Sequence, residues 1–242
     1  MIVSHRHRFI FLKTRKTAGT SIEIALSPFC GPDDILAPLS PADETLRMTG
    51  GQVLARNYLA QTADMERYAH LVSLGGREAL TLLRSFSGRV GGFYNHMPAR
   101  EVKPLLPEDV WQGYYKFTVE RNPWDQMVSR YYWKNRTKWL MPSFSRFLRT
   151  ELEHRDRGKG SNFDVYAIDG APAVDHVMRY EQLSDEMRIL AGRIGLGDNL
   201  RMPNAKGGKR RRPGYRELYN AKDRAFVAQH FAREIELMGY EF

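Results

Sequence analysis

Cysteine is almost absent from this chain of 242 residues, in which Cys30 stands alone. A single thiol excludes an intrachain disulfide and a metal site built on cysteines, and it favours a reducing compartment. Long apolar runs are also lacking: no stretch reaches the roughly 18 apolar residues of a membrane span, and residues 9–12 are too short for the apolar core of a signal peptide. These absences predict a soluble, cytoplasmic protein without a membrane span.

Acidic residues are scarce relative to basic ones. The chain has 28 Asp and Glu against 37 Lys and Arg, a net charge of +9 and an isoelectric point near 9.7. This balance favours polyanionic partners (nucleotides, nucleic acid, acidic or sulfated glycans, anionic membranes) and does not choose among them. Contents of 42% hydrophobic and 27% charged residues are typical of globular proteins, and the length suits a single domain over residues 1–242.

The stretch at residues 9–26, FIFLKTRKTAGTSIEIAL, has the order strand, basic turn, helix. Its four leading apolar residues predict a buried strand, and Thr20 and Glu23 have the spacing of a capping box at a helix start. Free N–H groups and the helix dipole attract anions to such a start. The small side chains of the turn therefore predict a phosphate-binding loop. The alternative is an ordinary connection with a solvated basic turn.

Glycine is missing from the place where a nucleotide hydrolase needs it. The pattern G-x-x-x-x-G-K-[ST] is absent, because Lys16 precedes Gly19 and no glycine opens the turn. Formal charge in the turn comes from Lys13, Arg15 and Lys16. The loop is therefore expected to bind phosphate without being the loop of an ordinary ATPase.

Further strands and helices alternate along the chain. Aromatic and β-branched residues at 114–119 and an apolar run at 174–178 predict two more strands. Helices are predicted to start at Asn122, at Leu183 and at Asn220, the last with a single apolar face. This alternation predicts an α/β fold with a central parallel sheet flanked by helices on both sides. Ligands then bind at the carboxyl ends of the strands.

A second candidate anion site follows the strand at 114–119. Arg121 is expected at the end of this strand, and Ser129 lies two turns into the helix capped by Asn122. A strand-end arginine binds a phosphate through two N–H groups, and a helix serine donates its hydroxyl to the same group. Taken alone, however, an arginine beside a helix cap more often has a structural role.

The two segments together resemble two motifs of the sulfotransferases that use 3′-phosphoadenosine 5′-phosphosulfate (PAPS). The first reads Arg15-Lys16-Thr17-Ala18-Gly19-Thr20-Ser21, and the second reads Arg121-Asn122-Pro123-Trp124-Asp125 followed by Ser129 and Tyr131. They occur in the order that the family has. The chain looks closest to the branch shared by bacterial sulfotransferases and the glycan sulfotransferases of the animal Golgi.

The resemblance implies a sulfotransferase fold, with a P-loop-like central parallel sheet flanked by helices. It assigns the 5′-phosphosulfate to the first motif, where Thr17, Ala18, Gly19, Thr20 and Ser21 form the cradle and Lys16 stabilises the leaving group. Arg15 is expected either to assist in binding the co-substrate or to bind an acidic acceptor. It assigns the 3′-phosphate to Arg121 and Ser129. Lysine and arginine then neutralise the charge, so no metal is expected.

Two positions depart from the family's pattern. Arg15 replaces the usual proline, and Glu120 stands where an aliphatic residue is more frequent. A carboxylate there either orients Arg121 or weakens its grip on phosphate, and orientation is the preferred interpretation. The likeness covers most of the chain and thins out at about 31–90 and 134–170, which are expected to form the walls of the acceptor site.

A histidine suits the removal of a proton from an acceptor hydroxyl at neutral pH. His96 lies in a predicted loop between elements, where catalytic groups concentrate. The segment with His96, Ala99 and Glu101 resembles the family segment that carries the catalytic base. His96 is therefore the expected base and His70 the reserve, whereas His176, in a predicted strand, is expected to belong to the core.

A basic run that contains glycine occupies residues 206–212. It has three possible interpretations: a solvated surface loop, a nucleic-acid patch, or a flap over the 3′-phosphate. Because sulfotransferases often close a basic loop over that phosphate, the resemblance favours the flap, with Lys209, Arg210 and Arg211 as the candidate contacts.

The leading hypothesis is a PAPS-dependent sulfotransferase that acts on a hydroxyl or amine acceptor, with Lys16 and His96 as catalytic residues. Basic residues within 134–170 make an acidic glycan a candidate acceptor, although such runs are often only solvated. Two alternatives stay open. A kinase-like P-loop enzyme that uses ATP needs a carboxylate for Mg²⁺, for which Glu120 is the obvious candidate. A non-enzymatic nucleic-acid binder is suggested by the net charge and by residues 206–212, but it lacks a recognisable module.

Overall fold

The computed structural model describes residues 1–51, 53–58, 66–67, 70–71, 73–74, 92–154, 161–202 and 214–242. In these residues a central sheet has the strand order β3-β1-β2-β4-β7. Its strands are β1 (Ile2–Ser4), β2 (Phe9–Phe11), β3 (Ile35–Leu36), β4 (Tyr115–Glu120) and β7 (His176–Arg179). A separate hairpin pairs β5 (Ala167–Ile168) with β6 (Ala171–Pro172).

The sheet is mostly parallel. β2 pairs with β4 and β4 with β7 in parallel, whereas β1 runs antiparallel to both of its neighbours, β2 and β3. The prediction of a central parallel sheet is confirmed in this form, with β1 as the reversed strand. The three strands predicted from sequence correspond to β2, β4 and β7, with ends shifted by one or two residues.

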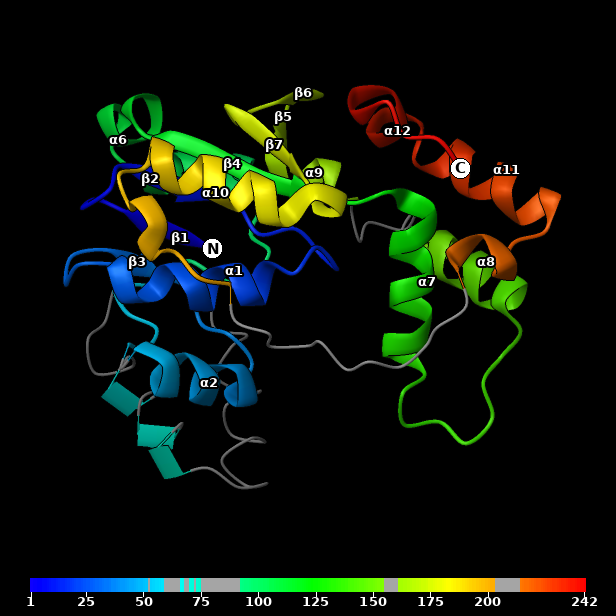
Figure 1. Cartoon of the computed structure of the whole chain (residues 1–242), viewed down its shortest axis with the longest axis horizontal. Coiled ribbons are helices and arrows are strands. Elements are labelled where there is room, and N and C mark those ends of the chain that lie inside the picture. The colour runs from blue at the N-terminus through cyan, green and yellow to red at the C-terminus, as the bar shows by residue number, and fades with distance from the viewer. Residues whose placement is uncertain are drawn as a thin grey trace.

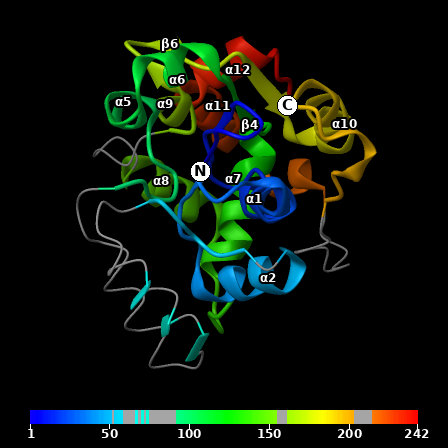
Figure 2. The same cartoon turned by 90° about the vertical axis from the view of Figure 1, so that its left-hand side faces the viewer.

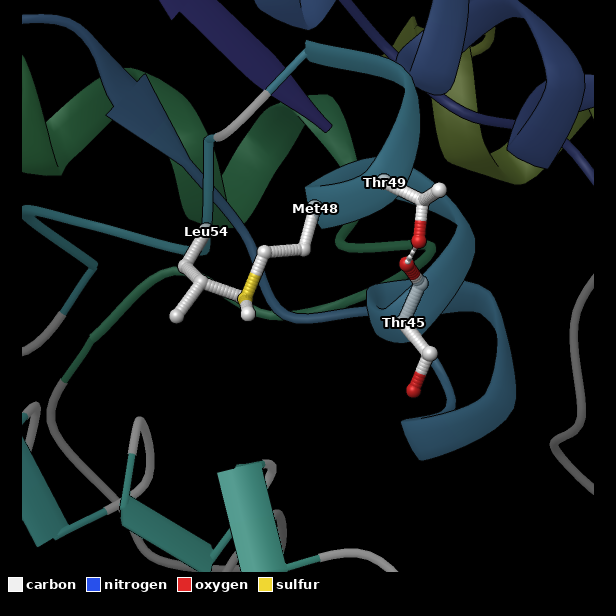
Figure 3. Close-up of a pocket in the computed structure, with 4 residues that line it drawn as sticks. All are labelled: Thr45, Met48, Thr49 and Leu54. Carbon is white, nitrogen blue, oxygen red and sulfur yellow. Dashed lines mark hydrogen bonds between the residues drawn. The ribbon is translucent and has the colours of Figure 1, made fainter.

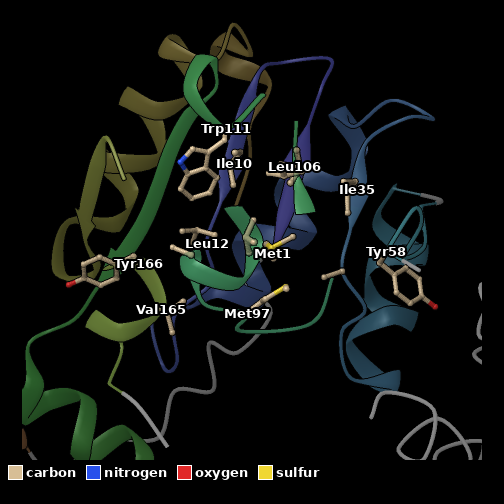
Figure 4. Packing of buried hydrophobic residues seen from close by; sticks show 14 of the residues in the cluster. Met1, Ile10, Leu12, Ile35, Tyr58, Met97, Leu106, Trp111, Val165 and Tyr166 are labelled. Atoms are coloured by element: carbon tan, nitrogen blue, oxygen red, sulfur yellow. The ribbon is translucent and has the colours of Figure 1, made fainter. Parts of the chain in front are cut away.

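Both faces of the sheet are apolar, because successive side chains of a strand point to opposite faces. Met1, Val3 and Ile10 belong to one buried cluster, whereas Ile2 and Phe9 belong to another. On the first face lie α5 (Ala99–Val102), α6 (Glu108–Gly113) and α9 (Phe163–Tyr166), and on the second lie α1 (Gly19–Leu26) and α10 (Leu183–Arg193). Figure 2 shows the sheet between these two groups, and Figure 4 shows the packing of the first cluster.

A third apolar cluster joins four helices beyond the carboxyl end of β4, to the right in Figure 1. These helices are α7 (Pro123–Lys134), α8 (Phe144–His154), α11 (Ala221–His230) and α12 (Ala232–Met238). The prediction of one continuous terminal helix is wrong, because Phe231 leaves the helical conformation and separates α11 from α12. The predicted apolar face is confirmed, since Val227, Phe231 and Met238 are all buried in this cluster.

One more helix, α2 (Pro41–Gly51), packs against α1 on the side away from the sheet. Among the helices that the structure describes, none has the length and apolar character needed to cross a lipid bilayer.

Candidate functional site

The loop between β2 and α1 has an unusual backbone. Lys16 (φ 67°) and Ala18 (φ 60°) both lie in the left-handed region, which costs on the order of 1 kcal/mol or more for a residue other than glycine. Alternation between left-handed and ordinary backbone gathers successive N–H groups into a concavity that binds anions. His96 is also left-handed, with φ 63°. Three strained residues thus belong to the candidate site.

The start of α1 is free of side-chain caps. Ala18 is the N-cap and no side chain accepts from the first turn, so the prediction of a capping box between Thr20 and Glu23 is wrong. The N–H groups of the first turn have no intrahelical acceptor, and in the described residues the hydroxyls of Thr20 and Ser21 make no hydrogen bond. The helix start therefore keeps donors for an external anion.

Glu23 has a different partner from the one that the capping box implies. Lys13 Nζ lies 2.6 Å from Glu23 Oε2, and the amino group of Met1 contacts the other oxygen, all fully or almost fully buried. Burial alone would raise the pKa of Glu23, but these two positive charges outweigh it and lower the pKa to about 2. The charge of Lys13 is therefore neutralised inside the protein, and the expectation that it supplies charge to the loop is wrong.

Gly19 is required by this buried pair. A Cβ at Gly19 would lie 2.6 Å from Lys13 Cγ, which is closer than real side chains approach. Lys13 cannot yield easily, because Glu23 holds its ammonium group. Thr17 is likewise fixed, since its hydroxyl lies 2.8 Å from that of Thr14, which in turn donates to the Val119 carbonyl. Thr17 and Gly19, which the sequence predicts as phosphate ligands, thus also have a structural role in the loop.

Helix α7 supports the loop from the side. Gln126 Nε2 donates to the Arg15 carbonyl at 3.2 Å, and Lys16 Nζ lies 5.3 Å from the centre of the Trp133 ring, within the range of a cation–π interaction. Ser129 lies three residues after Gln126 and four before Trp133, so it shares their face of the helix. The helix thereby brings Ser129 to the same side as Lys16.

Arg121 joins the two motifs directly. Its Nη1 donates to the Lys16 carbonyl at 3.0 Å. Asp125 accepts from Nε at 2.8 Å and lies 2.7 Å from Nη2, while the Tyr180 ring lies under the guanidinium at 4.1 Å. The prediction that Glu120 orients this guanidinium is wrong, because Glu120 contacts Arg121 through the backbone N–H of that residue, whereas Asp125 holds the side chain.

Asn162 ties the same two loops together by another route. Its Oδ1 accepts from the Arg15 N–H at 2.9 Å, and its Nδ2 donates to the Arg15 carbonyl at 3.0 Å. The same amide lies 3.2 Å from Glu120 Oε1, and Tyr166 donates to Oε2 of that carboxyl. Burial raises the pKa of Glu120 to about 8. No sequence pattern singled out Asn162, which is 147 residues away from Arg15.

His96 lies against the start of the loop. Its Nδ1 is 2.9 Å from the Lys13 carbonyl, and since a carbonyl only accepts, Nδ1 carries the proton and Nε2 keeps a free lone pair. Burial, together with the charge of Lys13, lowers the pKa of His96 to about 3. The ring is therefore neutral at physiological pH. The reserve candidate His70 is exposed.

Other predicted residues lie elsewhere. His176 is half-exposed and 2.8 Å from Glu186, so its assignment to the core is wrong. Lys209, Arg210 and Arg211 lie outside the described residues. Within the described part of the chain, no group of three or more His, Cys, Asp or Glu side chains is placed to hold a metal ion.

The two segments expected to form the acceptor walls are described in part. In 31–90, α2 carries a pocket of about 490 Å³ lined by Thr45, Met48, Thr49 and Leu54, in which the Thr49 hydroxyl donates to the Thr45 carbonyl (Figure 3). In 134–170, the loop after α7 leaves Trp139 and Leu140 exposed. Their role in acceptor binding stays a prediction.

Comparison with known proteins gives one relative and one structural neighbour to report. An uncharacterized protein of Archaeoglobus fulgidus is 31% identical over 108 residues, which cover 43% of this chain and 87% of the archaeal protein. A crystal structure of a sulfotransferase from Alicyclobacillus acidocaldarius has a TM-score of 0.45 and 17% identity, over 97% of this chain and 96% of that one. No family model matches the chain.

Proposed function

The chain belongs to the same family as the Archaeoglobus fulgidus protein, and we propose that it is a sulfotransferase that moves a sulfuryl group from PAPS to a hydroxyl or amine acceptor. The observation that carries this proposal is the hydrogen bond between Arg121 Nη1 and the Lys16 carbonyl. It joins the two segments whose residues resemble the 5′- and 3′-phosphate motifs. A doubly phosphorylated nucleotide needs two cationic cradles close together, and the connection of β2 to α1, which we propose to be P-loop-like, is proposed to be one of them.

Lys16 and the first turn of α1 are proposed to hold the 5′-phosphosulfate. As the bond between sulfur and the phosphate oxygen breaks, negative charge grows on that oxygen, and preorganised N–H groups with one ammonium stabilise it. The uncapped N–H groups of Gly19, Thr20 and Ser21 supply the donors. Arg15 supplies further charge beside them. The left-handed backbone at Lys16 and Ala18 supports this role, since strained residues concentrate where a site must be preorganised.

Arg121 and Ser129 are proposed to hold the 3′-phosphate. A guanidinium has five N–H groups, and the contacts with Asp125 and with the Lys16 carbonyl use three of them. Two N–H groups are left for a phosphate, and the Ser129 hydroxyl, which makes no hydrogen bond to a described residue, can join them. Lys209, Arg210 and Arg211 are proposed to close over this phosphate.

His96 is proposed as the general base. Its Nε2 takes the proton of the acceptor as the acceptor atom bonds to sulfur and adenosine 3′,5′-bisphosphate leaves. A pKa of about 3 keeps Nε2 unprotonated but makes it a weak base. An anionic nucleotide bound beside the ring raises this pKa, because nearby negative charge favours the imidazolium form. Co-substrate binding thereby makes His96 a stronger base.

The acceptor is proposed to bind between segments 31–90 and 134–170. We also propose that residues 1–242 form a single domain and that the protein acts in the cytoplasm. An acidic glycan fits the exposed Trp139 together with the basic residues around it, since aromatic rings pack on sugars and cations bind carboxylates. The kinase alternative is weakened by Glu120. This carboxyl accepts hydrogen bonds from Arg121, Asn162 and Tyr166, and its raised pKa makes it a poor ligand for Mg²⁺.

Calorimetry with the full chain tests the proposal. Adenosine 3′,5′-bisphosphate is titrated in the presence of EDTA, and ATP is titrated with and without Mg²⁺. We expect the bisphosphate to bind without metal and ATP to bind more weakly in both conditions. Binding of Mg²⁺–ATP with no binding of the bisphosphate would overturn the proposal and favour the kinase. A gel shift with nucleic acid below micromolar protein, without bisphosphate binding, would favour the nucleic-acid binder.

A further inference from the structure

A second basic site lies at the opposite end of the strands from the Lys16 loop. The Lys16 loop follows the carboxyl end of β2, whereas this recess lies at the amino ends of β2 and β4. It has a volume of about 620 Å³ and is lined by Arg6, His7 and Arg8 from the β1–β2 turn, by Tyr115 at the start of β4, and by Arg193 at the end of α10.

The turn that carries the three amino-terminal residues is held rigidly. The Asp34 carboxylate accepts from Ser4 Oγ at 2.8 Å, from the His5 N–H at 2.7 Å and from the Arg6 N–H at 3.2 Å. On the other side, His7 Nδ1 lies 3.1 Å from the carbonyl of Ile194, next to Arg193. The recess is therefore preorganised by contacts that do not use its guanidinium groups.

The arginines of the recess have no acidic partner in the part of the chain that the structure describes. Within the described residues, Arg6, Arg8 and Arg193 form no ion pair. Their recorded side-chain contacts include aromatic rings: Arg8 lies 5.7 Å from the Tyr114 ring and Arg193 lies 4.3 Å from the Tyr115 ring.

Two nearby carboxylates have other partners. Asp175 lies 3.2 Å from Lys116 Nζ, and Glu186 lies 2.8 Å from His176 Nε2. Within the described residues, none of the three guanidinium groups thus forms an ion pair, and the Asp34 carboxylate beside the turn is bound to the Ser4 hydroxyl and to backbone N–H groups. Such an arrangement lowers its electrostatic energy when an anion binds.

We propose that this recess binds an oxyanion, the phosphate or sulfate group of a small molecule. Guanidinium groups match the geometry of such oxyanions through paired N–H donors, and stacking on a tyrosine ring fixes their plane while leaving the N–H edge free. Arg193 lies 4.3 Å from the Tyr115 ring, which lines the recess, and Arg8 and Arg6 line the same recess from the β1–β2 turn. The proposal does not depend on the activity of the Lys16 loop.

Nuclear magnetic resonance of the ¹⁵N-labelled full chain tests the recess separately from the loop. Inorganic sulfate and inorganic phosphate are titrated at constant ionic strength, with chloride as the balancing ion. We expect saturable shifts of the amides of His7, Gly113 and Gly195. Arg193→Gln and Arg6→Gln should each raise the dissociation constant by about tenfold or more. The shifts of Gly19, Thr20 and Ser21 report the other site in the same spectra.

A matched control and a second titrant complete the design. Arg188→Gln removes an exposed arginine of α10 that lies next to Asp185, and it should leave the recess shifts unchanged. N-acetylglucosamine 6-sulfate is compared with its unsulfated form: tighter binding than inorganic sulfate identifies a sulfate ester, and equal binding identifies the free oxyanion. The proposal would be overturned if the recess amides do not shift saturably, or if they respond in Arg193→Gln and Arg6→Gln as they do in the parent protein, whatever the amides of the Lys16 loop do.

Discussion

The guanidinium of Arg121 donates to the carbonyl of Lys16 at 3.0 Å, across 105 residues of sequence. Because the donor and the acceptor belong to the two cationic segments, neither segment is positioned independently of the other. The left-handed backbone at Lys16 is the part of the loop that this contact holds. Arg121 thus has a structural role and still keeps two N–H groups for a ligand, so the two interpretations of a strand-end arginine are compatible.

Replacement of Arg121 by lysine should separate charge from geometry. Lysine keeps the positive charge but cannot bind Asp125 and the Lys16 carbonyl at once or stack flat on Tyr180. We expect the dissociation constant of adenosine 3′,5′-bisphosphate, measured by calorimetry, to rise about tenfold or more. Arg188→Lys on α10 is the matched control and should bind normally. Normal binding by Arg121→Lys would remove this arginine from the nucleotide site.

Replacement of Lys16 by methionine should lower turnover by roughly 10²–10⁴-fold, a range typical of one essential group in the transition state. Methionine has a similar length and loses the charge that lies beside the Trp133 ring, so the free energy of unfolding should change by no more than about 1 kcal/mol. Transfer of radiolabelled sulfate from PAPS to pooled acceptors measures the effect. Lys222→Met, at an exposed position on α11, serves as the control. Equal loss in both variants would argue against a specific role.

His96→Asn tests the proposed base while preserving the backbone, because asparagine tolerates a positive φ. Turnover should fall by roughly 10²–10⁴-fold. Since the pKa of His96 is lowered from 6.5 to about 3 in the folded state, the unfolded chain binds the extra proton between these values, and stability falls as the pH falls below 6.5. Urea unfolding at pH 7 and pH 5 should show this loss in the parent protein and less of it in the variant. Normal turnover would remove His96 from the mechanism.

Glu120 should give the free energy of unfolding a pH dependence opposite to that of His96, and Glu120→Gln should remove this dependence. The pKa of Glu120 is raised from 4.5 to about 8 on folding, so the unfolded chain releases its proton first and stability falls as the pH rises from 4.5 to 8. Glutamine resembles the neutral acid, and urea unfolding should show the variant gaining relative to the parent between pH 5 and pH 8. Glu236→Gln, at an exposed position on α12, should show no such gain. Identical pH profiles for the parent and Glu120→Gln would mean that Glu120 is ionised.

Two glycines allow a matched test of the loop's packing. Gly19→Ala places a methyl group against the buried stem of Lys13 and should destabilise the protein by about 1–3 kcal/mol. Gly192→Ala, in α10, meets open space and should stabilise it by about 0.5–1 kcal/mol through helix propensity. Chemical denaturation measures both. A Gly19→Ala protein as stable as its parent would show that Lys13 moves aside freely.

Local chemistry explains what the sequence could predict. The start of α7 was predicted correctly because Asn122 accepts from the Trp124 and Asp125 N–H groups within its own turn. The capping box of Thr20 failed because Lys13 pairs with Glu23, which no local rule anticipates. Strand β1 was missed because its three residues precede a charged turn and gain their burial only through β2 and β3.

The candidate site likewise contains residues that the sequence predicts and residues that only the fold reveals. The motif residues of both loops could be found from the sequence because their types and spacing are distinctive. The residues that hold these loops in place could not be found in this way, because the contacts of Asn162 and Gln126 with Arg15 span 147 and 111 residues. Asn162 and Gln126 carry no charge and belong to neither motif, so only the folded chain identifies them as part of the site.

The most direct measurement is a crystal structure of the full chain with adenosine 3′,5′-bisphosphate. We expect the 5′-phosphate on the N–H groups at the start of α1, within reach of Lys16, and the 3′-phosphate on Arg121 and Ser129. The nucleotide bound elsewhere, or one phosphate in contact and the other in solvent, would contradict the proposal that these two loops form a single nucleotide site.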